Sequence, residues 1–250
     1  MRRALGILAG VLSHALFLGT VWQLFGFLQG SAPHARGPLW IDLLLAGQFG
    51  VVHSLLLLPA VRRKLERWIP QAFYGCFFST ATCLTLLLAF SQWRTSPAVV
   101  FQANGLAAIV VEIGFGASWA ALFYSLHLSG LGYQTGWTPW WHWFRGRPSP
   151  PRQFQPRSAY LIMRHPVYLS FLGLVWFVPT VTLDRAALIA VWTIYIFLGS
   201  YLKDRRLQYY LGVRYREYQA RVPGYPGMMF GPLARIPAVT APAAKEALAR

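Results

Sequence analysis

Long apolar runs separated by short basic segments constrain the fold of this 250-residue chain more than any other feature. Runs of roughly 20 apolar residues are typical of helices that cross a lipid bilayer. Only 12% of the residues are charged, about half the share in a soluble domain, which supports the same interpretation. We therefore expect an all-α polytopic membrane bundle of roughly five or six transmembrane helices. The apolar runs cover about residues 4–29, 39–61, 71–93, 103–128, 166–182 and 186–202.

The last two apolar runs are shorter than the others and nearly continuous. Pro179 lies within the first of them, and Asp184 and Arg185 lie between them. Proline interrupts a helix, and two charged residues favour a tight turn outside the apolar region. We expect the two runs to form a helical hairpin that need not cross the whole membrane.

The basic residues lie in loops between the apolar runs, so the formal net charge of +16 indicates membrane orientation and no nucleic-acid partner. If the N-terminus is cytosolic, only Arg36, Arg94 and Arg185 of the 23 Lys and Arg residues lie on the opposite side. The other 20 then face the cytosol, as the positive-inside rule requires. The tryptophan-rich, proline-broken segment 129–160 is expected at the cytosolic interface.

Metal binding is not expected. The two cysteines, Cys76 and Cys83, are seven positions apart in one apolar run, beyond disulfide reach on a helix. The six histidines show no spacing typical of metal ligands. The cysteines are interpreted as packing residues.

The pentapeptide Arg164–Tyr168, R-H-P-V-Y, lies where a basic loop enters an apolar run. Proline favours the first position of a helix, so a helix should begin at Pro166. The free N–H groups of its first turn would suit an anionic ligand group. The alternative is a positively charged anchor at a helix end, with His165 bonded to a carbonyl.

A second pattern follows the last apolar run, with Asp204, Leu207, Gly212, Tyr215 and Tyr218 at fixed spacing. Together with R-H-P-x-Y, it resembles the integral-membrane methyltransferases related to isoprenylcysteine carboxyl methyltransferase. Further stretches are similar to the methanethiol S-methyltransferase branch of that superfamily. They are His53-Ser54, Trp93, Gly114 to His127, Gly132 with Gln134, Trp176 to Thr182 and Thr193 to Ile196.

Three features depart from the pattern that these proteins share. Lys203 and Asp204 stand where the superfamily has two adjacent glutamates, and Tyr74 and Gly75 replace a Glu-Arg pair. The arginine of the branch's G-L-R-Q signature has no clear counterpart. The fold and the cofactor are therefore expected to carry over better than the substrate.

The resemblance implies S-adenosylmethionine as cofactor in a multi-pass protein of a bacterial cytoplasmic membrane, with a cytosolic N-terminus and cofactor site. Arg164 would bind the cofactor's carboxylate, and Asp204 its ammonium or ribose hydroxyls. Replacing Asp204 by Ala should then weaken cofactor binding without unfolding the protein. The expected cofactor-binding residues are Arg164, His165, Pro166, Tyr168, Asp204, Tyr215 and Tyr218.

The implied reaction is S-methylation of a small thiol, namely methanethiol to dimethyl sulfide. A water-poor pocket favours a step in which a thiolate and a sulfonium lose their charges, but it also raises the pKa of the free thiol. His127 is the candidate base, with a carbonyl-bonded interfacial histidine as the alternative. His53 and Gln134 are the candidate substrate-binding residues. The expected partners are the thiol and membrane lipids.

Two other interpretations remain open from the sequence. In the first, the cofactor is the same but the acceptor is a prenyl or lipid carboxylate or another thiol. In the second, the chain is a non-catalytic membrane protein of the same superfamily. In each case residues 1–232 are expected to form one membrane-embedded domain, with its cofactor half at about 129–228. The Ala/Pro-rich residues 233–250 are expected to form a loose tail.

Overall fold

The computed structural model of the chain describes residues 2–30, 34–35 and 37–237, so most of the expected tail, residues 238–250, lies outside the described part. Within it, five helices are long and apolar enough to cross a membrane. None of them contains a proline, so nothing interrupts their backbone hydrogen bonds. The expected polytopic helical bundle is confirmed. The five are α1 (Arg2–Leu28), α2 (Leu39–Leu57), α4 (Gln71–Gln92), α5 (Leu106–Ser129) and α10 (Leu183–Leu211).

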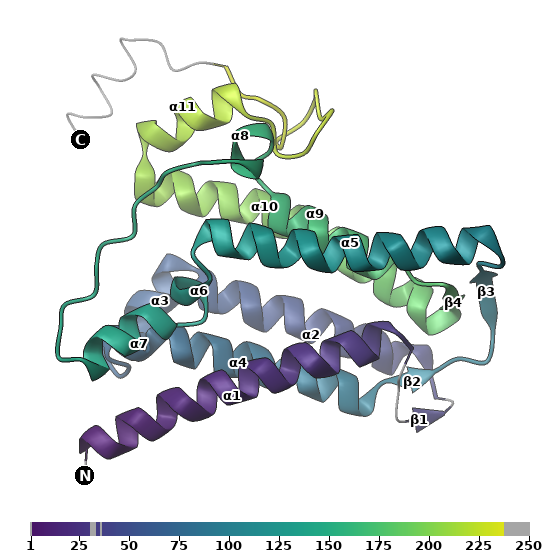
Figure 1. The fold of residues 1–250 in the computed structure, drawn as a ribbon, viewed down its shortest axis with the longest axis horizontal. Coiled ribbons are helices and arrows are strands. Elements are labelled where there is room, and N and C mark those ends of the chain that lie inside the picture. The colour runs from purple at the N-terminus through teal and green to yellow at the C-terminus, as the bar shows by residue number, and fades with distance from the viewer. Residues whose placement is uncertain (1, 31–33, 36, 238–250) are drawn as a thin grey trace.

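The long helices run side by side, and short elements cap the bundle at its ends (Figure 1). The strands form two small ladders at one end, whereas the N-terminus lies at the opposite end. The strands are β1 (His34–Ala35), β2 (Arg94–Thr95), β3 (Val99–Gln102) and β4 (Thr180–Thr182). The short helices are α3 (Pro59–Leu65), α6 (Leu131–Gln134), α7 (Trp137–Phe144), α8 (Ala159–Ile162) and α11 (Val213–Arg221).

β1 pairs with β2 in parallel, and β3 pairs with β4 antiparallel. The pairing brings together the loops that the charge pattern assigns to one side of the membrane, around residues 34, 94–102 and 180–182. Arg94 lies in this region, and Arg185 follows β4 in the first turn of α10, whereas Arg36 lies outside the described residues. The structure therefore places Arg94 and Arg185 at the same end of the bundle.

The helical hairpin consists of α9 (Pro166–Trp176), which begins at Pro166 as expected, and α10. The two helices pack against each other. The expected turn at Asp184 and Arg185 is wrong, because both residues are buried in the first turn of α10. The chain turns earlier, at 177–182, where pairing of β4 with β3 satisfies the backbone. The Asp184 carboxylate accepts hydrogen bonds from Trp93 Nε1 and the Ser96 amide, both at 2.8 Å.

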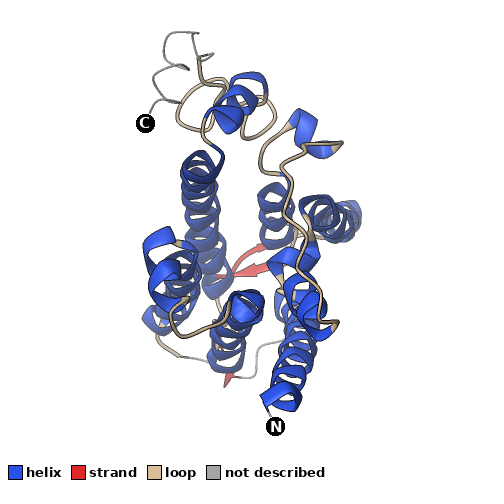
Figure 2. Ribbon diagram, turned by 90° about the vertical axis from the view of Figure 1, so that its left-hand side faces the viewer, coloured by secondary structure: helices blue, strands red, loops and turns tan. Residues whose placement is uncertain are grey.

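The hydrophobic core lies between the long helices, which Figure 2 shows nearly end-on as one bundle. Aromatic side chains from α1 and α4 fill its centre: the Phe27 and Phe90 rings stack with centroids 4.6 Å apart, and Trp93 is fully buried. Leu174 of α9 and Leu188 of α10 complete this cluster. The core thus anchors the hairpin, which carries Arg164 at the start of α9 and Asp204 on α10.

The tryptophan helix α7 packs onto α1 and α4 through glycines. Trp140 donates its Nε1–H to the Gly6 carbonyl at 3.1 Å. A Cβ on Gly75 would lie only 2.4 Å from Gly136 Cα, so the backbones of α4 and the turn before α7 are in direct contact. Gly136 has a φ of 83°, a conformation that favours glycine.

Candidate functional site

Arg164 joins the start of α9 to α10 and to the C-terminal residues. It is 1% exposed, and its guanidinium Nε and Nη2 donate to Asp204 Oδ2 at 3.1 and 2.9 Å. The other N–H groups donate to backbone carbonyls, so all five are used. The carbonyl acceptors are Val222 at 2.6 Å, Ala234 at 3.2 Å and Leu233 at 3.2 Å.

Two of these acceptors belong to the segment that the sequence assigns to the tail. Leu233 and Ala234 are buried, and the Leu233 carbonyl also accepts a hydrogen bond from the Gly224 amide at 2.7 Å. The packed part of the chain therefore extends past residue 232. The extension follows from the buried guanidinium, which needs more carbonyl acceptors than α9 and α10 supply.

Asp204 completes this buried cluster from α10. Its Oδ1 accepts the Tyr215 hydroxyl at 2.5 Å. Burial, together with the negative charge of Asp204, raises the pKa of Tyr215 well above its usual range, so the hydroxyl stays protonated and donates. The Tyr218 hydroxyl instead donates to the Tyr160 carbonyl at 2.5 Å. The structure thus brings Arg164, Asp204 and Tyr215 together, as the two sequence patterns predict.

His165 is fully buried beside this cluster. Its Nε2 lies 3.1 Å from Asp204 Oδ1 but is misaligned for a hydrogen bond, and its Nδ1 has no partner among the described residues. Burial lowers the pKa of His165 to about 4 and outweighs the opposite effect of Asp204, so the imidazole is neutral at pH 7. Unpaired polar atoms in such a place are rare in proteins and are suited to a ligand's polar group.

Lys203 and Arg206 place positive charge on the same part of α10. Lys203 Nζ lies 5.2 Å from the ring centre of Tyr168 and 5.8 Å from that of Tyr160. Within the part of the chain that the structure describes, neither cation forms an ion pair with a carboxylate. Two cations without a carboxylate partner, three positions apart on one helix, are chemically suited to an anionic ligand group.

A cavity of about 210 Å³ lies between α2, α9 and α10, toward the end of the bundle where α2 meets α3. It brings His53 and Tyr168 together, two residues that the sequence assigns to substrate and cofactor. Its polar lining also includes residues to which the sequence assigns no role. The polar and charged lining residues are His53, Ser54, Tyr168, Tyr195, Arg205, Arg206 and Tyr209.

Glycines shape the walls of this cavity. A Cβ on Gly50 would lie 2.9 Å from Tyr195 Cδ2, and one on Gly199 would lie 3.2 Å from Tyr168 Cε1. Each tyrosine ring therefore lies on the backbone of a neighbouring helix position that lacks a side chain. This packing leaves little rotational freedom to the two hydroxyls that border the cavity.

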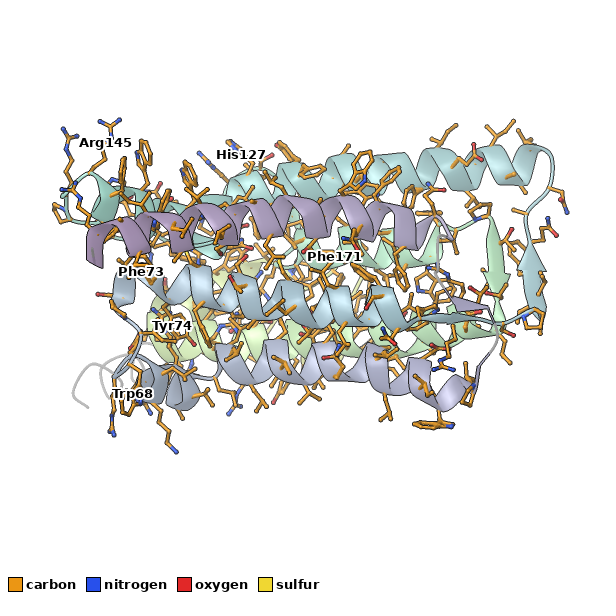
Figure 3. All side chains as sticks on the ribbon, turned by 90° about the horizontal axis from the view of Figure 1, so that it is seen from below. Trp68, Phe73, Tyr74, His127, Arg145 and Phe171 are labelled. Atoms are coloured by element: carbon orange, nitrogen blue, oxygen red, sulfur yellow. The ribbon has the colours of Figure 1, made fainter. Side chains whose placement is uncertain are left out.

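The predicted base and one predicted substrate residue lie elsewhere. His127 is exposed on the last turn of α5, at the edge of the bundle in Figure 3, whereas Phe171 lies inside it. Gln134 donates to Ser129 Oγ at 2.5 Å. Neither residue lines the cavity that holds His53 and Tyr168. The roles of His127 as base and Gln134 as substrate residue stay predictions, because neither residue lies at the cavity.

The sequence reasoning assigned no site role to four polar residues that line the cavity, namely Tyr195, Arg205, Arg206 and Tyr209. A signal exists in the sequence, because Tyr195, Gly199, Leu202 and Arg206 recur every three or four residues on one face of α10. A tyrosine and an arginine on an otherwise apolar helix face are unusual in a membrane segment. The spacing does not say which neighbouring helix that face meets.

Five spanning helices and a buried Arg–Asp–Tyr cluster that joins the C-terminal residues to the bundle define a multi-pass helical membrane protein with a cavity near one end. Comparison with curated proteins then gives its relatives. The chain is 29% identical over 238 residues to Methanethiol S-methyltransferase 1 of Bradyrhizobium diazoefficiens, covering 87% of this chain and 80% of the relative. It is 27% identical over 238 residues to the Methanethiol S-methyltransferase of Mycobacterium tuberculosis, covering 89% and 96%. The resemblance that the motifs predict is confirmed.

A more distant similarity extends beyond bacteria. The chain is 28% identical over 180 residues to Nurim of Mus musculus, covering 67% of each chain. No family model matches the chain. No solved structure is significantly similar to it.

Proposed function

We propose that the chain is an S-adenosylmethionine-dependent methyltransferase that converts a small thiol, methanethiol, to its methyl thioether, dimethyl sulfide. The observation that carries the proposal is the cavity between α2, α9 and α10, which His53 and Tyr168 both line. The chain that forms it is similar to six curated proteins with the name methanethiol S-methyltransferase. The charge pattern supports a cytoplasmic-membrane location with the N-terminus and the cofactor site on the cytosolic side.

The residues present fit this cofactor. The Nδ1 of His165 offers a hydrogen-bonding position, and Lys203 and Arg206 offer cations without a carboxylate partner among the described residues. Aromatic faces such as that of Tyr168 are suited to a sulfonium. When bound, S-adenosylmethionine supplies an electrophilic methyl group on a sulfonium.

The roles within the predicted cofactor set are then divided. Arg164 has no unused N–H, so binding the cofactor's carboxylate would require one of its five hydrogen bonds to open. We assign a structural role at the site to Arg164, Asp204 and Tyr215. Lys203 and Arg206 are assigned to binding the cofactor's carboxylate. Pro166 begins α9. His165, Tyr168 and Tyr218 remain assigned to cofactor binding, within the cofactor half of the single domain.

The cavity suits a small acceptor. A volume of about 210 Å³ is several times that of one water molecule in the liquid, about 30 Å³. Most of its walls are apolar, which favours a step in which opposite charges disappear. A prenyl chain would need space that extends beyond this cavity.

The test uses the full chain in membranes of expressing cells. With methanethiol and S-adenosylmethionine added, dimethyl sulfide should accumulate in the headspace, and membranes from cells that lack the gene should give none. Cofactor binding without dimethyl sulfide would contradict the acceptor. Absence of cofactor binding would favour the second candidate, a non-catalytic membrane protein of the same superfamily.

A further inference from the structure

We propose that His53 and Tyr195 form the proton relay that deprotonates the acceptor thiol inside the cavity. The inference rests on the proposed function and assigns the base, for which the sequence offered His127. His127 is exposed at the edge of the bundle, whereas His53 and Tyr195 line the cavity on opposite helices. A base must be within hydrogen-bond reach of the proton that it removes.

The two side chains are directly bonded across the interface of α2 and α10. Tyr195 Oη lies 2.7 Å from His53 Nδ1, and Ser54 Oγ donates to Tyr195 Oη at 3.4 Å. Because the tyrosine oxygen already accepts from Ser54, we assign its proton to the bond with His53 Nδ1, so the neutral imidazole carries its hydrogen on Nε2. The Tyr195 oxygen then has a lone pair left to accept a proton from the cavity.

Packing holds this pair in place. The Tyr195 ring lies on Gly50, and the His53 ring has aromatic neighbours in Phe49 and Phe78, with ring centres 5.6 and 5.1 Å away. A polar pair inside a membrane helix bundle is costly unless its groups bond each other. This pair lies at a cavity wall, and it differs in this respect from a hydrogen bond between helices that is buried on all sides.

The relay balances in atoms and charge. The thiol proton passes to Tyr195 Oη while the Tyr195 proton passes to His53 Nδ1, which leaves a neutral tyrosine and an imidazolium. The thiol sulfur keeps the S–H electron pair and forms its new bond to the methyl group with it, as the bond from that methyl to the donor sulfur breaks. The imidazolium later returns its proton to water.

The charges that face the relay favour a thiolate in the cavity. The facing element α4 contributes the aromatic Phe78 to His53. The positive charge near the relay comes from α10, where Arg206 lines the same cavity. A cation at this position lowers the cost of an anionic sulfur in an apolar environment. The titratable and charged groups that line the cavity are His53, Tyr168, Tyr195, Tyr209, Arg205 and Arg206.

The test compares two acceptors, ethanethiol, which is un-ionised at neutral pH, and thiophenol, a far stronger acid. In Tyr195→Phe and His53→Gln the rate with ethanethiol should fall about 100-fold, the usual contribution of a positioned base. With thiophenol at a pH where it is ionised, the loss should be less than about fivefold, because no proton has to be removed. Tyr201→Phe is the matched control, since Tyr201 lies on the same helix, is partly exposed and does not line the cavity.

The pH profile gives a second readout that a purely structural role would not move. With ethanethiol, the rate of Tyr195→Phe should rise about tenfold per pH unit, following the free thiolate, while that of the unmodified chain rises less steeply. Equal losses with both thiols, or an unchanged rate with ethanethiol, would overturn the relay alone. An unmodified chain that methylates no thiol would overturn the proposed function, and the relay with it.

Discussion

Asp204 shows how one residue's role depends on what the fold places around it. Its sequence context predicts a ligand for the cofactor, but both carboxylate oxygens already accept hydrogen bonds from the protein. Oδ2 accepts twice from Arg164, and Oδ1 accepts from Tyr215. A buried ion pair of this kind contributes little net free energy, yet removing one partner leaves the other charge uncompensated.

We therefore expect Asp204→Ala to lower the free energy of unfolding by about 3–5 kcal/mol, because the Arg164 guanidinium would remain buried without its counter-charge. This differs from the sequence-based prediction that the substitution leaves the fold intact. Thermal unfolding of the detergent-purified protein measures the change. Glu217→Ala, at an exposed acidic position of α11, is the control and should stay within about 0.5 kcal/mol. Equal stability of the two variants would show that Arg164 finds another anion.

At the scale of elements, α7 depends on glycines in its neighbours. Gly75 and Gly136 bring backbone against backbone, and Gly10 lies beneath the Trp140 ring. The sequence marks Gly75 only as a departure from a Glu-Arg pair in similar proteins. The structure gives that departure a packing consequence, since a side chain at this position would separate α7 from α4.

Gly75→Ala should cost about 1–3 kcal/mol, because its Cβ would meet Gly136 Cα at 2.4 Å and a backbone atom cannot move aside by rotating. The matched control is Gly47→Ala on α2, where a Cβ would have no heavy atom within 4 Å. There the substitution should be neutral or stabilise the helix by up to about 1 kcal/mol. Thermal unfolding of both variants in one detergent gives the comparison. A stable Gly75→Ala would mean that α7 is not held in this position.

At the scale of the whole molecule, the bundle has one end with paired strands and another with α3, α7 and the N-terminus (Figure 1). Among the described basic residues that the charge pattern assigns to the outer side, Arg94 and Arg185 lie at the strand end. The positive-inside rule predicts that the strand end lies outside and that the end with α3 and α7 faces the cytosol.

Cysteine labelling in intact cells tests this orientation. In a chain whose buried Cys76 and Cys83 are replaced by Ala, Asn104→Cys at the strand end should react with a membrane-impermeant maleimide. Ser149→Cys, also exposed but in the loop after α7, should react only after permeabilisation. The opposite pattern would invert the topology and place the proposed cofactor site outside the cytosol.

Much of this architecture follows from local properties of the chain. The apolar runs predict the long helices, and Pro166 predicts the start of α9, because hydrophobicity and proline geometry act over one segment at a time. The spacing of Arg164 and Asp204 also correctly indicates two halves of one cluster. The misplaced turn at Asp184 shows the limit, since pairing of β4 with β3 moved the start of α10 to Leu183.

What only the tertiary structure decided is how these segments face one another. Tyr195 bonds to His53, which is 142 positions away in the sequence. Arg164 donates hydrogen bonds to the carbonyls of Leu233 and Ala234, which lie 69 and 70 positions later. Such contacts depend on the rotation of each helix about its axis and on how closely backbones approach at glycines. Neither quantity is encoded in a single segment, because a helix face acquires its role only from the helix packed against it.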